Sequence, residues 1–125
     1  MNIKMAYLHG VLKEEIYMEQ PEGFIAKGEE DKVCKLVHSF YRLKQAGQVW
    51  NRTFANTTKK KLGFKMIHSD VCVYVICQQQ GGITKIILIL YVDDLLHLGE
   101  DQSKIKNVDE STHQIPSNGL LFSTF

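Results

Sequence analysis

Two aliphatic runs interrupted by a pair of acidic residues constrain the fold of this chain more than any other feature. The segment ILILYVDDLLHLG covers positions 87–99, with Asp93 and Asp94 at its centre. The flanking runs are typical of strands, and we predict strands at 83–92 and 95–99. Aspartate is favoured in turns, so the pair fits the tip of a hairpin between two antiparallel strands. A cation site at that tip is the alternative, because carboxylate oxygens are ligands that Mg²⁺ prefers.

The rest of the chain mixes helical and strand patterns. A helix is predicted from Ala46 to Leu62, ended by Gly63. The remaining predicted segments are a strand end and turn over 1–12, a short hairpin or extended loop over 16–24, strands over 33–37 and 71–77, and a turn over 78–82. Because hairpins and helices alternate without a parallel βαβ pattern, we predict the α+β class.

The last part of the chain has a different character. From Glu100 onward polar residues dominate, no periodic pattern continues, and Pro116 and Gly119 interrupt the segment. We therefore predict one partial domain over residues 1–102 and a divergent, poorly ordered tail over 103–125.

Charge is distributed unevenly, although the formal net charge is only +1. Nine Lys or Arg residues and no Asp or Glu occur between Lys32 and Lys65. A basic stretch of this length predicts an acidic partner, most simply a nucleic-acid phosphate backbone. The alternative is a solvated helix face whose charges are balanced by acidic neighbours in space.

Composition excludes several classes of protein. The longest apolar run, 86–92, is far shorter than the roughly 20 residues that span a bilayer, and no signal peptide opens the chain. Three cysteines without a CxxC motif favour a reduced, intracellular protein of unspecified compartment. His68, Cys72 and Cys77 are a conceivable zinc set, but cysteines in apolar strands are usually core residues.

Four sequence blocks together resemble a known family. They are MNIKMAYLHG at 1–10, EEIYMEQPEGF at 14–24, FYRLKQAGQVW at 40–50 and YVDD at 91–94. In order and spacing they are similar to the reverse transcriptase domain of Ty1/copia-type retrotransposons, from Met1 to about Gln102. The resemblance implies a partial right-hand palm, an antiparallel sheet with a YVDD hairpin backed by helices. It also implies RNA-directed DNA polymerase activity with Mg²⁺ or Mn²⁺, acting on a template–primer and deoxynucleotides.

The resemblance also implies roles for individual residues. Asp93 and Asp94 would be the catalytic, metal-binding aspartates, with Tyr91 and Val92 beside the primer end. Tyr7 would screen the sugar of the incoming nucleotide, and Gln45 would lie near that nucleotide; the alternatives are a core-edge tyrosine and a helix-surface amide. The positions expected to contact nucleic acid are Lys44, Arg52, Lys59, Lys60 and Lys61. Trp50 is expected in the core.

Departures from the family pattern bear on activity. Asn2 stands where the family has its first metal-binding aspartate, so weak or absent metal binding is expected. Arg42, Gly47 and Gln48 replace the usual glycine, proline and arginine of the third block. The resemblance also implies that fingers, thumb and ribonuclease H segments are missing. Two functions remain open: part of a retrotransposon polymerase, inactive in isolation, or a non-catalytic remnant with residual nucleic-acid binding or no function.

Overall fold

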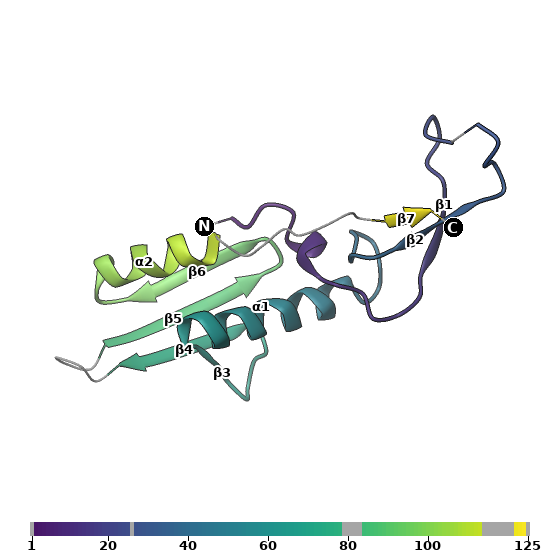
Figure 1. The fold of residues 1–125 in the computed structure, drawn as a ribbon. Helices are drawn as coiled ribbons and strands as arrows, with labels where there is room; N and C mark the ends of the chain where they lie inside the picture. The colour runs from purple at the N-terminus through teal and green to yellow at the C-terminus, as the bar shows by residue number, and fades with distance from the viewer. Residues whose placement is uncertain (1, 26, 79–83, 114–121, 125) are drawn as a thin grey trace.

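The structure, a computed structural model, describes residues 2–25, 27–78, 84–113 and 122–124 (Figure 1). In chain order its elements are the 3₁₀ helix η1 (Ala6–His9), β1 (Tyr17–Glu19), β2 (Val33–Leu36), α1 (Ala46–Leu62), β3 (Lys65–Met66), β4 (Val73–Gln78), β5 (Thr84–Tyr91), β6 (Asp94–Gly99), α2 (Gln102–His113) and β7 (Phe122–Thr124). The class is mixed α+β with antiparallel sheets, as the sequence predicted. Most of the predicted turn at 78–82 lies outside the described residues.

Four antiparallel strands form the main sheet, in the order β3-β4-β5-β6. The predicted strands on either side of the aspartate pair are confirmed as β5 and β6. Their register pairs Tyr91 with Asp94, which leaves Val92 and Asp93 as a two-residue connection. The alternation of β5 places Ile86, Leu88 and Leu90 on one face, and all three are buried.

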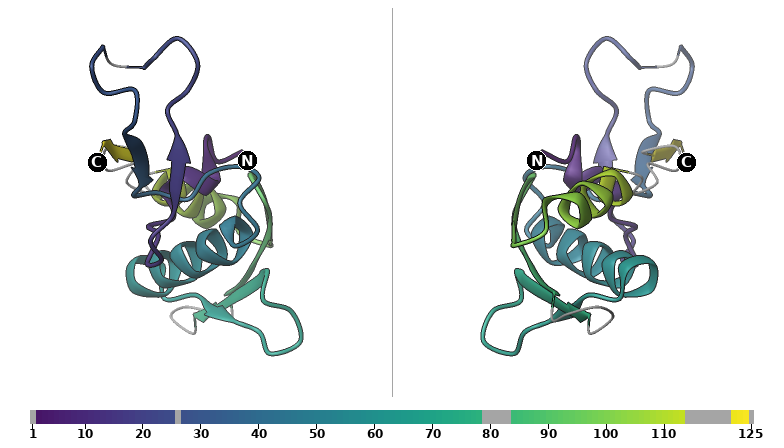
Figure 2. Two further views of the ribbon diagram at one scale, coloured as in Figure 1. Left: turned by 90° about the vertical axis from the view of Figure 1, so that its right-hand side faces the viewer. Right: turned by 90° about the vertical axis from the view of Figure 1, so that its left-hand side faces the viewer.

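Both helices lie on that buried face of the sheet (Figure 2). Helix α1 has the predicted bounds, and it ends at Gly63, whose φ of 75° lets its N–H bond to the Lys59 carbonyl. Trp50, Phe54 and Thr58 recur every four residues on α1 and are at most 1 % exposed. Trp50 is thus a core residue, as predicted. Neither described helix has the length and apolar character needed to cross a membrane.

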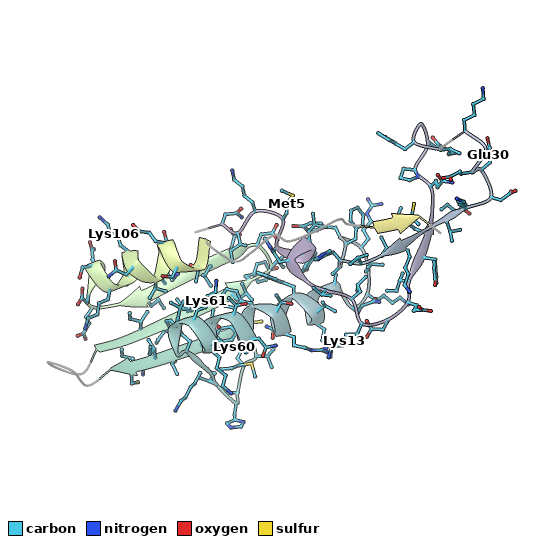
Figure 3. All side chains as sticks on the ribbon, in the orientation of Figure 1. Met5, Lys13, Glu30, Lys60, Lys61 and Lys106 are labelled. Carbon is cyan, nitrogen blue, oxygen red and sulfur yellow. The ribbon has the colours of Figure 1, made fainter. Side chains whose placement is uncertain are left out.

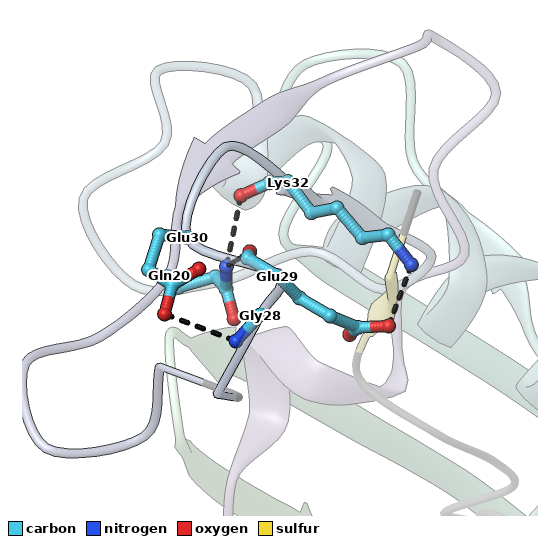
Figure 4. Close-up of polar contacts among 5 residues, drawn as sticks. All are labelled: Gln20, Gly28, Glu29, Glu30 and Lys32. Atoms are coloured by element: carbon cyan, nitrogen blue, oxygen red, sulfur yellow. Dashed lines mark hydrogen bonds and ion pairs between the residues drawn. The ribbon is translucent and has the colours of Figure 1, made fainter.

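A second, three-stranded sheet has the order β1-β2-β7. The loop between β1 and β2 is rich in acidic residues, and Figure 4 shows the contacts that shape it. The Gln20 amide nitrogen donates to the backbone carbonyls of Glu29 and Lys32 at 2.6 and 3.0 Å. The Gly28 backbone N–H donates to the Glu30 carboxylate at 3.0 Å, which lowers the pKa of Glu30.

Two segments differ from the sequence prediction. We expected a strand end over residues 1–12, but the described residues 2–12 contain the helical turn η1 between isolated backbone bridges at Asn2 and Val11. Helix α2 occupies Gln102–His113, inside the part expected to be poorly ordered. Its carboxyl-terminal half packs against the core through Val108, and Thr112 is only 2 % exposed. Ile105, Val108 and Thr112 recur at spacings of three and four residues on α2, a helical pattern that the sequence analysis did not recognise among the polar residues around it. Residues 114–121 and 125 of the predicted tail lie outside the described residues.

Candidate functional site

The connection between β5 and β6 has a strained backbone that neighbouring elements hold in place. Val92 has a φ of 52°, a conformation that is rare for a β-branched residue. The Trp50 indole nitrogen donates to the Val92 carbonyl at 2.8 Å, and the Ile3 backbone N–H donates to the Asp93 carbonyl at 2.6 Å. Helix α1 and the amino-terminal segment therefore fix both peptide carbonyls of the turn.

The Asp93 carboxylate faces Tyr41, which lies in the loop before α1. The Tyr41 hydroxyl is 3.0 and 3.1 Å from the two Asp93 carboxylate oxygens and donates to them. Burial, reinforced by the Asp93 carboxylate, raises the pKa of Tyr41 above its ordinary value of 10.0, so the hydroxyl keeps its proton at neutral pH. The Tyr41 and Tyr7 rings pack with their centroids 4.7 Å apart.

The Asp94 carboxylate has a different neighbour. The Asn2 side-chain nitrogen donates to Asp94 Oδ1 at 3.1 Å, and the two residues also form an isolated backbone bridge. A carboxylate only accepts hydrogen bonds, so the amide nitrogen, not its oxygen, faces Asp94. Position 2 thus lies beside the turn, as the match to the first sequence block requires.

A groove with a volume of about 710 Å³ runs from this turn along α1. Its walls come from α1, the β3–β4 connection, the end of β5 and η1. Apolar side chains and backbone form most of it, while amides and one guanidinium add hydrogen-bond donors. The residues that line it are Tyr7, Gly47, Gln48, Trp50, Asn51, Arg52, Ala55, Asn56, Met66, Val71, Cys72, Leu90, Tyr91 and Val92. Tyr91 is 77 % exposed beside it.

The basic residues predicted to bind nucleic acid are divided between different surfaces. Helix α1 carries Arg52, Lys59, Lys60 and Lys61 and no acidic residue. Arg52 lines the groove, and Lys59, seven residues later, lies on the same side of the helix. Lys61 lies on the opposite side, in a smaller cavity of about 310 Å³ between α1 and α2 that Lys104 also lines. Figure 3 shows Lys60 and Lys61 on different sides of α1. Lys44 is exposed in the loop before the helix.

Among the residues expected to bind nucleotide, Tyr7 lines the groove and Gln45 does not. Gln45 is half-buried at the N-cap position of α1, and its backbone carbonyl accepts a hydrogen bond from the Val49 N–H. Sequence reasoning missed Tyr41, whose hydroxyl donates to the Asp93 carboxylate, a contact that neither Tyr7 nor Gln45 makes. Tyr41 belongs to the block FYRLKQAGQVW, but no local sequence pattern links it to Asp93, which lies 52 positions away.

Comparison with known proteins identifies the family. The family model described as "Reverse transcriptase (RNA-dependent DNA polymerase)" matches residues 1–115. The chain belongs to the reverse transcriptase family. This match continues past Gln102, where the sequence resemblance was expected to end, and it includes all of α2.

The curated relatives of this reverse transcriptase chain are transposon proteins of the Ty1/copia type. It is 47 % identical over 105 residues, 84 % of the chain, to the retrovirus-related Pol polyprotein from transposon TNT 1-94 of Nicotiana tabacum. It is 36 % identical over 117 residues, 91 % of the chain, to the corresponding polyprotein from transposon RE2 of Arabidopsis thaliana. The chain spans 8 % of the length of each of these relatives.

A shorter transposon protein is similar to the chain at the same identity as the RE2 polyprotein. The putative transposon Ty5-1 protein of Saccharomyces cerevisiae is 36 % identical over 96 residues, which is 77 % of this chain and 30 % of that protein. No solved structure shows significant similarity to the chain.

Reverse transcriptases generally use divalent metal ions, and the turn residues meet that requirement only in part. Asp93 and Asp94 supply two carboxylates, but each already accepts a hydrogen bond from a neutral donor, Tyr41 or Asn2. Within the described residues no three His, Cys, Asp or Glu side chains come together as a metal-binding group. Because Asn2, at the position expected to supply a further carboxylate, presents an amide N–H to Asp94, the residues do not fit a site that needs carboxylates from two strands.

Proposed function

We propose that this chain is part of a reverse transcriptase palm that binds a template–primer duplex in the groove along α1. In this assignment the β5–β6 connection is the YVDD hairpin, and α1 and α2 are the helices behind it. The groove carries the proposal, because Arg52 and the exposed Tyr91 both line it beside the turn that bears Asp93 and Asp94.

Electrostatics supports a polyanionic occupant. Arg52 and Lys59 share the groove side of a helix that has no acidic residue to offset them. Phosphate contacts from such side chains give affinity without reading sequence. The amides of Gln48, Asn51 and Asn56 add groups that can hydrogen-bond to sugar or base edges. One end of a duplex in the groove would then lie at Tyr91 and Val92, the positions expected beside the primer terminus.

The nucleotide roles follow from the same placement. Tyr7 lines the groove and packs against Tyr41, which in turn holds the Asp93 carboxylate. A rigid ring in that position is suited to screening a sugar substituent. Gln45 lies at the start of α1, outside the groove lining, and its side chain makes no capping hydrogen bond.

Nucleotidyl transfer is not supported to the same degree. The family reaction depends on metal ions held by carboxylates, and here Asn2 leaves the set one carboxylate short. We therefore propose that the chain binds nucleic acid without polymerising nucleotides. This combines the family assignment with the alternative of a non-catalytic protein with residual nucleic-acid binding.

Salt-dependent binding of a DNA or RNA–DNA duplex tests this proposal, with Lys61→Ala as the matched control for Lys59→Ala. Each lost phosphate contact should reduce the slope of log affinity against log salt by about 0.9 for B-DNA and about 0.7 for single strands. We expect Arg52→Ala and Lys59→Ala each to reduce the magnitude of the slope by the amount that corresponds to one lost phosphate contact, about 0.9 for B-DNA. Lys61→Ala, on the opposite side of α1, should leave it unchanged.

Two results would contradict the proposal. Binding that is absent at low salt would remove nucleic acid as the occupant. Equal slopes for Lys59→Ala and Lys61→Ala would show that the helix face along the groove is not the interface.

A further inference from the structure

The acidic connection between β5 and β6 joins two segments that lie far from it in the sequence. From the amino-terminal segment, the Asn2 amide donates to the Asp94 carboxylate at 3.1 Å. The next residue, Ile3, donates its backbone N–H to the Asp93 carbonyl at 2.6 Å. From the loop before α1, the Tyr41 hydroxyl donates to both oxygens of the Asp93 carboxylate. Figure 1 shows the amino-terminal segment passing beside the connected ends of the two strands.

The donors that the structure places at this connection are uncharged. They are a carboxamide, a backbone N–H and a phenol hydroxyl, and within the described residues neither Asp93 nor Asp94 forms an ion pair. A hydrogen bond to an ionised carboxylate is roughly twice as strong as one between neutral groups. These contacts therefore stabilise the carboxylate charges without a positive charge beside them.

The contact between Tyr41 and Asp93 lies between two strained stretches of backbone. Arg42, which follows Tyr41, has a φ of 78°, and Val92, which precedes Asp93, has a φ of 52°. A residue with a Cβ atom keeps such a conformation only where the surrounding structure determines it. The Tyr7 ring packs against the Tyr41 ring and restrains it. The hydrogen bond from Tyr41 to Asp93 thus links both strained segments and helps to hold them.

We propose that this connection is a structural clasp, which holds the amino-terminal segment and the loop before α1 in place. The clasp consists of Asn2, Ile3, Tyr41, Asp93 and Asp94. Its two carboxylates contribute to folding rather than to the binding of a divalent ion. A site built for such an ion brings together carboxylates from different strands, and these repel one another until the ion binds. Here N–H and O–H donors occupy the neighbouring positions. The clasp does not depend on nucleic-acid binding in the groove.

A clasp and a metal-binding site differ in the sign of one effect. If the carboxylates are gathered for an ion, removing one of them relieves repulsion, so the protein in the presence of a chelator becomes more stable. If the Asp93 carboxylate holds Tyr41, its removal breaks a hydrogen bond to a charged group and makes the protein less stable. The stability of variants in a chelator therefore distinguishes the two roles.

Urea unfolding of the full chain in EDTA measures that sign. We expect Asp93→Leu and Tyr41→Phe each to lower the folding equilibrium constant about tenfold, because each removes a hydrogen bond to a charged group. Both substitutions remove the same contact, so the double variant should be scarcely less stable than either single variant. Tyr17→Phe is the matched control, since that hydroxyl lies 3.5 Å from the Glu15 carboxylate at an exposed site, and its effect should stay below about twofold.

Asn2→Asp and Mg²⁺ test the other half of the clasp. Asn2→Asp replaces the donor to Asp94 by a like charge, so in EDTA it should lower the folding constant several-fold. Asn107→Asp adds the same charge at an exposed position on α2, and as the control it should change the constant by less than about twofold. Mg²⁺ at about 1 mM should raise the folding constant of the natural chain by at most about twofold, as expected for millimolar or weaker affinity.

Three results would each overturn the proposal. If Asp93→Leu is as stable as the natural chain in EDTA, or more stable, the carboxylate does not hold Tyr41. Additive losses in the double variant would show that the two side chains act separately. A rise in the folding constant well above about twofold with Mg²⁺ at about 1 mM would show that the carboxylates bind an ion.

Discussion

At the scale of single residues, the adjacent aspartates of the turn have different environments because each meets a different part of the chain. Asp93 is the second residue of the two-residue connection, and its carboxylate accepts from the Tyr41 hydroxyl. Asp94 begins β6, and its carboxylate accepts from the Asn2 amide. Tyr41 and Asn2 are both uncharged, so neither neutralises the negative charge of the carboxylate that it contacts. Neither supplies a further negative charge to bind a divalent ion.

Asn2→Asp should improve Mg²⁺ binding. The substitution replaces a neutral donor by a carboxylate beside Asp94, which adds electrostatic attraction for a divalent cation. The carboxylates at positions 2 and 94 also repel each other, and a bound cation relieves that repulsion. We expect affinity in the millimolar range or weaker for the natural chain, and an improvement of roughly tenfold or more in the variant. Calorimetric titration with Mg²⁺, or spin-resonance titration with Mn²⁺, measures both.

Asn107→Asp provides the control, because it adds the same charge at an exposed position on α2. It should leave metal affinity unchanged. If Asn2→Asp and the natural chain bind Mg²⁺ equally, the carboxylates at positions 2, 93 and 94 do not form a common ion site.

At the scale of secondary-structure elements, α2 begins at a capping residue that the sequence analysis did not use. Asp101 Oδ1 accepts hydrogen bonds from the backbone N–H groups of Ser103 and Lys104, at 3.0 and 3.2 Å, and from the Ser103 hydroxyl at 2.6 Å. This is an N-cap arrangement, and a negative charge there also interacts favourably with the helix dipole. The other end of α2 packs on the core, and Asp109 Oδ1 lies 3.6 Å from His97 Nδ1 on β6.

The cap predicts a pH dependence of stability. Hydrogen bonds from Ser103 and Lys104 lower the pKa of Asp101 below its ordinary value of 3.8. Because the folded-state pKa is the lower one, the stabilising contribution is fully present above about pH 4 and is lost as the pH falls through the lowered pKa. Asp101→Asn keeps an acceptor but does not titrate, so the natural chain should be the more stable above about pH 4 and lose this advantage as the pH falls through the lowered pKa of Asp101.

Urea unfolding at several pH values measures this difference directly. Comparing the natural chain with Asp101→Asn at each pH cancels the titration of other carboxylates, such as Glu15 beside Lys35. A difference in unfolding free energy that is constant with pH would show that Asp101 does not cap α2 in the folded protein.

At the scale of the whole molecule, Trp50 connects α1, the turn and the core. Its indole N–H binds the Val92 carbonyl, and its ring packs edge-on against Phe54 with centroids 5.6 Å apart. The His9 ring of η1 also packs against Trp50, with ring centroids 5.7 Å apart. Because Ile3 fixes the adjacent Asp93 carbonyl, the turn is held from both sides by segments far apart in the chain.

Trp50→Ala should therefore destabilise the protein strongly. Removing a buried Trp side chain costs about 3–5 kcal/mol, a large share of the roughly 5–15 kcal/mol typical of a folded domain. The milder Trp50→Phe keeps most of the packing but removes the part-buried hydrogen bond to the Val92 carbonyl, at a cost of about 0.5–1.5 kcal/mol. Urea unfolding followed by circular dichroism measures both, since Trp50 is the single tryptophan and cannot serve as the probe.

Phe40→Ala is the reference for this series, because Phe40 is 47 % exposed. It should change the unfolding free energy much less than either Trp50 variant. An equal effect of Phe40→Ala and Trp50→Ala would show that the turn is not anchored through Trp50.

The sequence by itself determined the elements whose signals are local. The aliphatic alternation of β4, β5 and β6, the helical stripe of α1 and its stop at Gly63, and the aspartate pair between two strands all depend on residues within a few positions of one another. The family blocks placed Asn2 opposite the aspartate pair for the same reason, since each block is a short run of residues. In contrast, the short apolar stripe of α2, Ile105 and Val108, was not recognised among polar residues, and the helix is held in place by packing on β6 and α1.

Only the tertiary structure decided which side chains meet. Tyr41 and Asp93 are 52 residues apart, and Asn2 and Asp94 are 92 apart, so their hydrogen bonds arise from how the amino-terminal segment, the loop before α1 and the turn pack together. The same packing decided that Arg52 lines the groove while Lys61 lines the cavity between α1 and α2. Helical periodicity separates these residues on α1, but the sheet and the β3–β4 connection determine which side of the helix borders the groove.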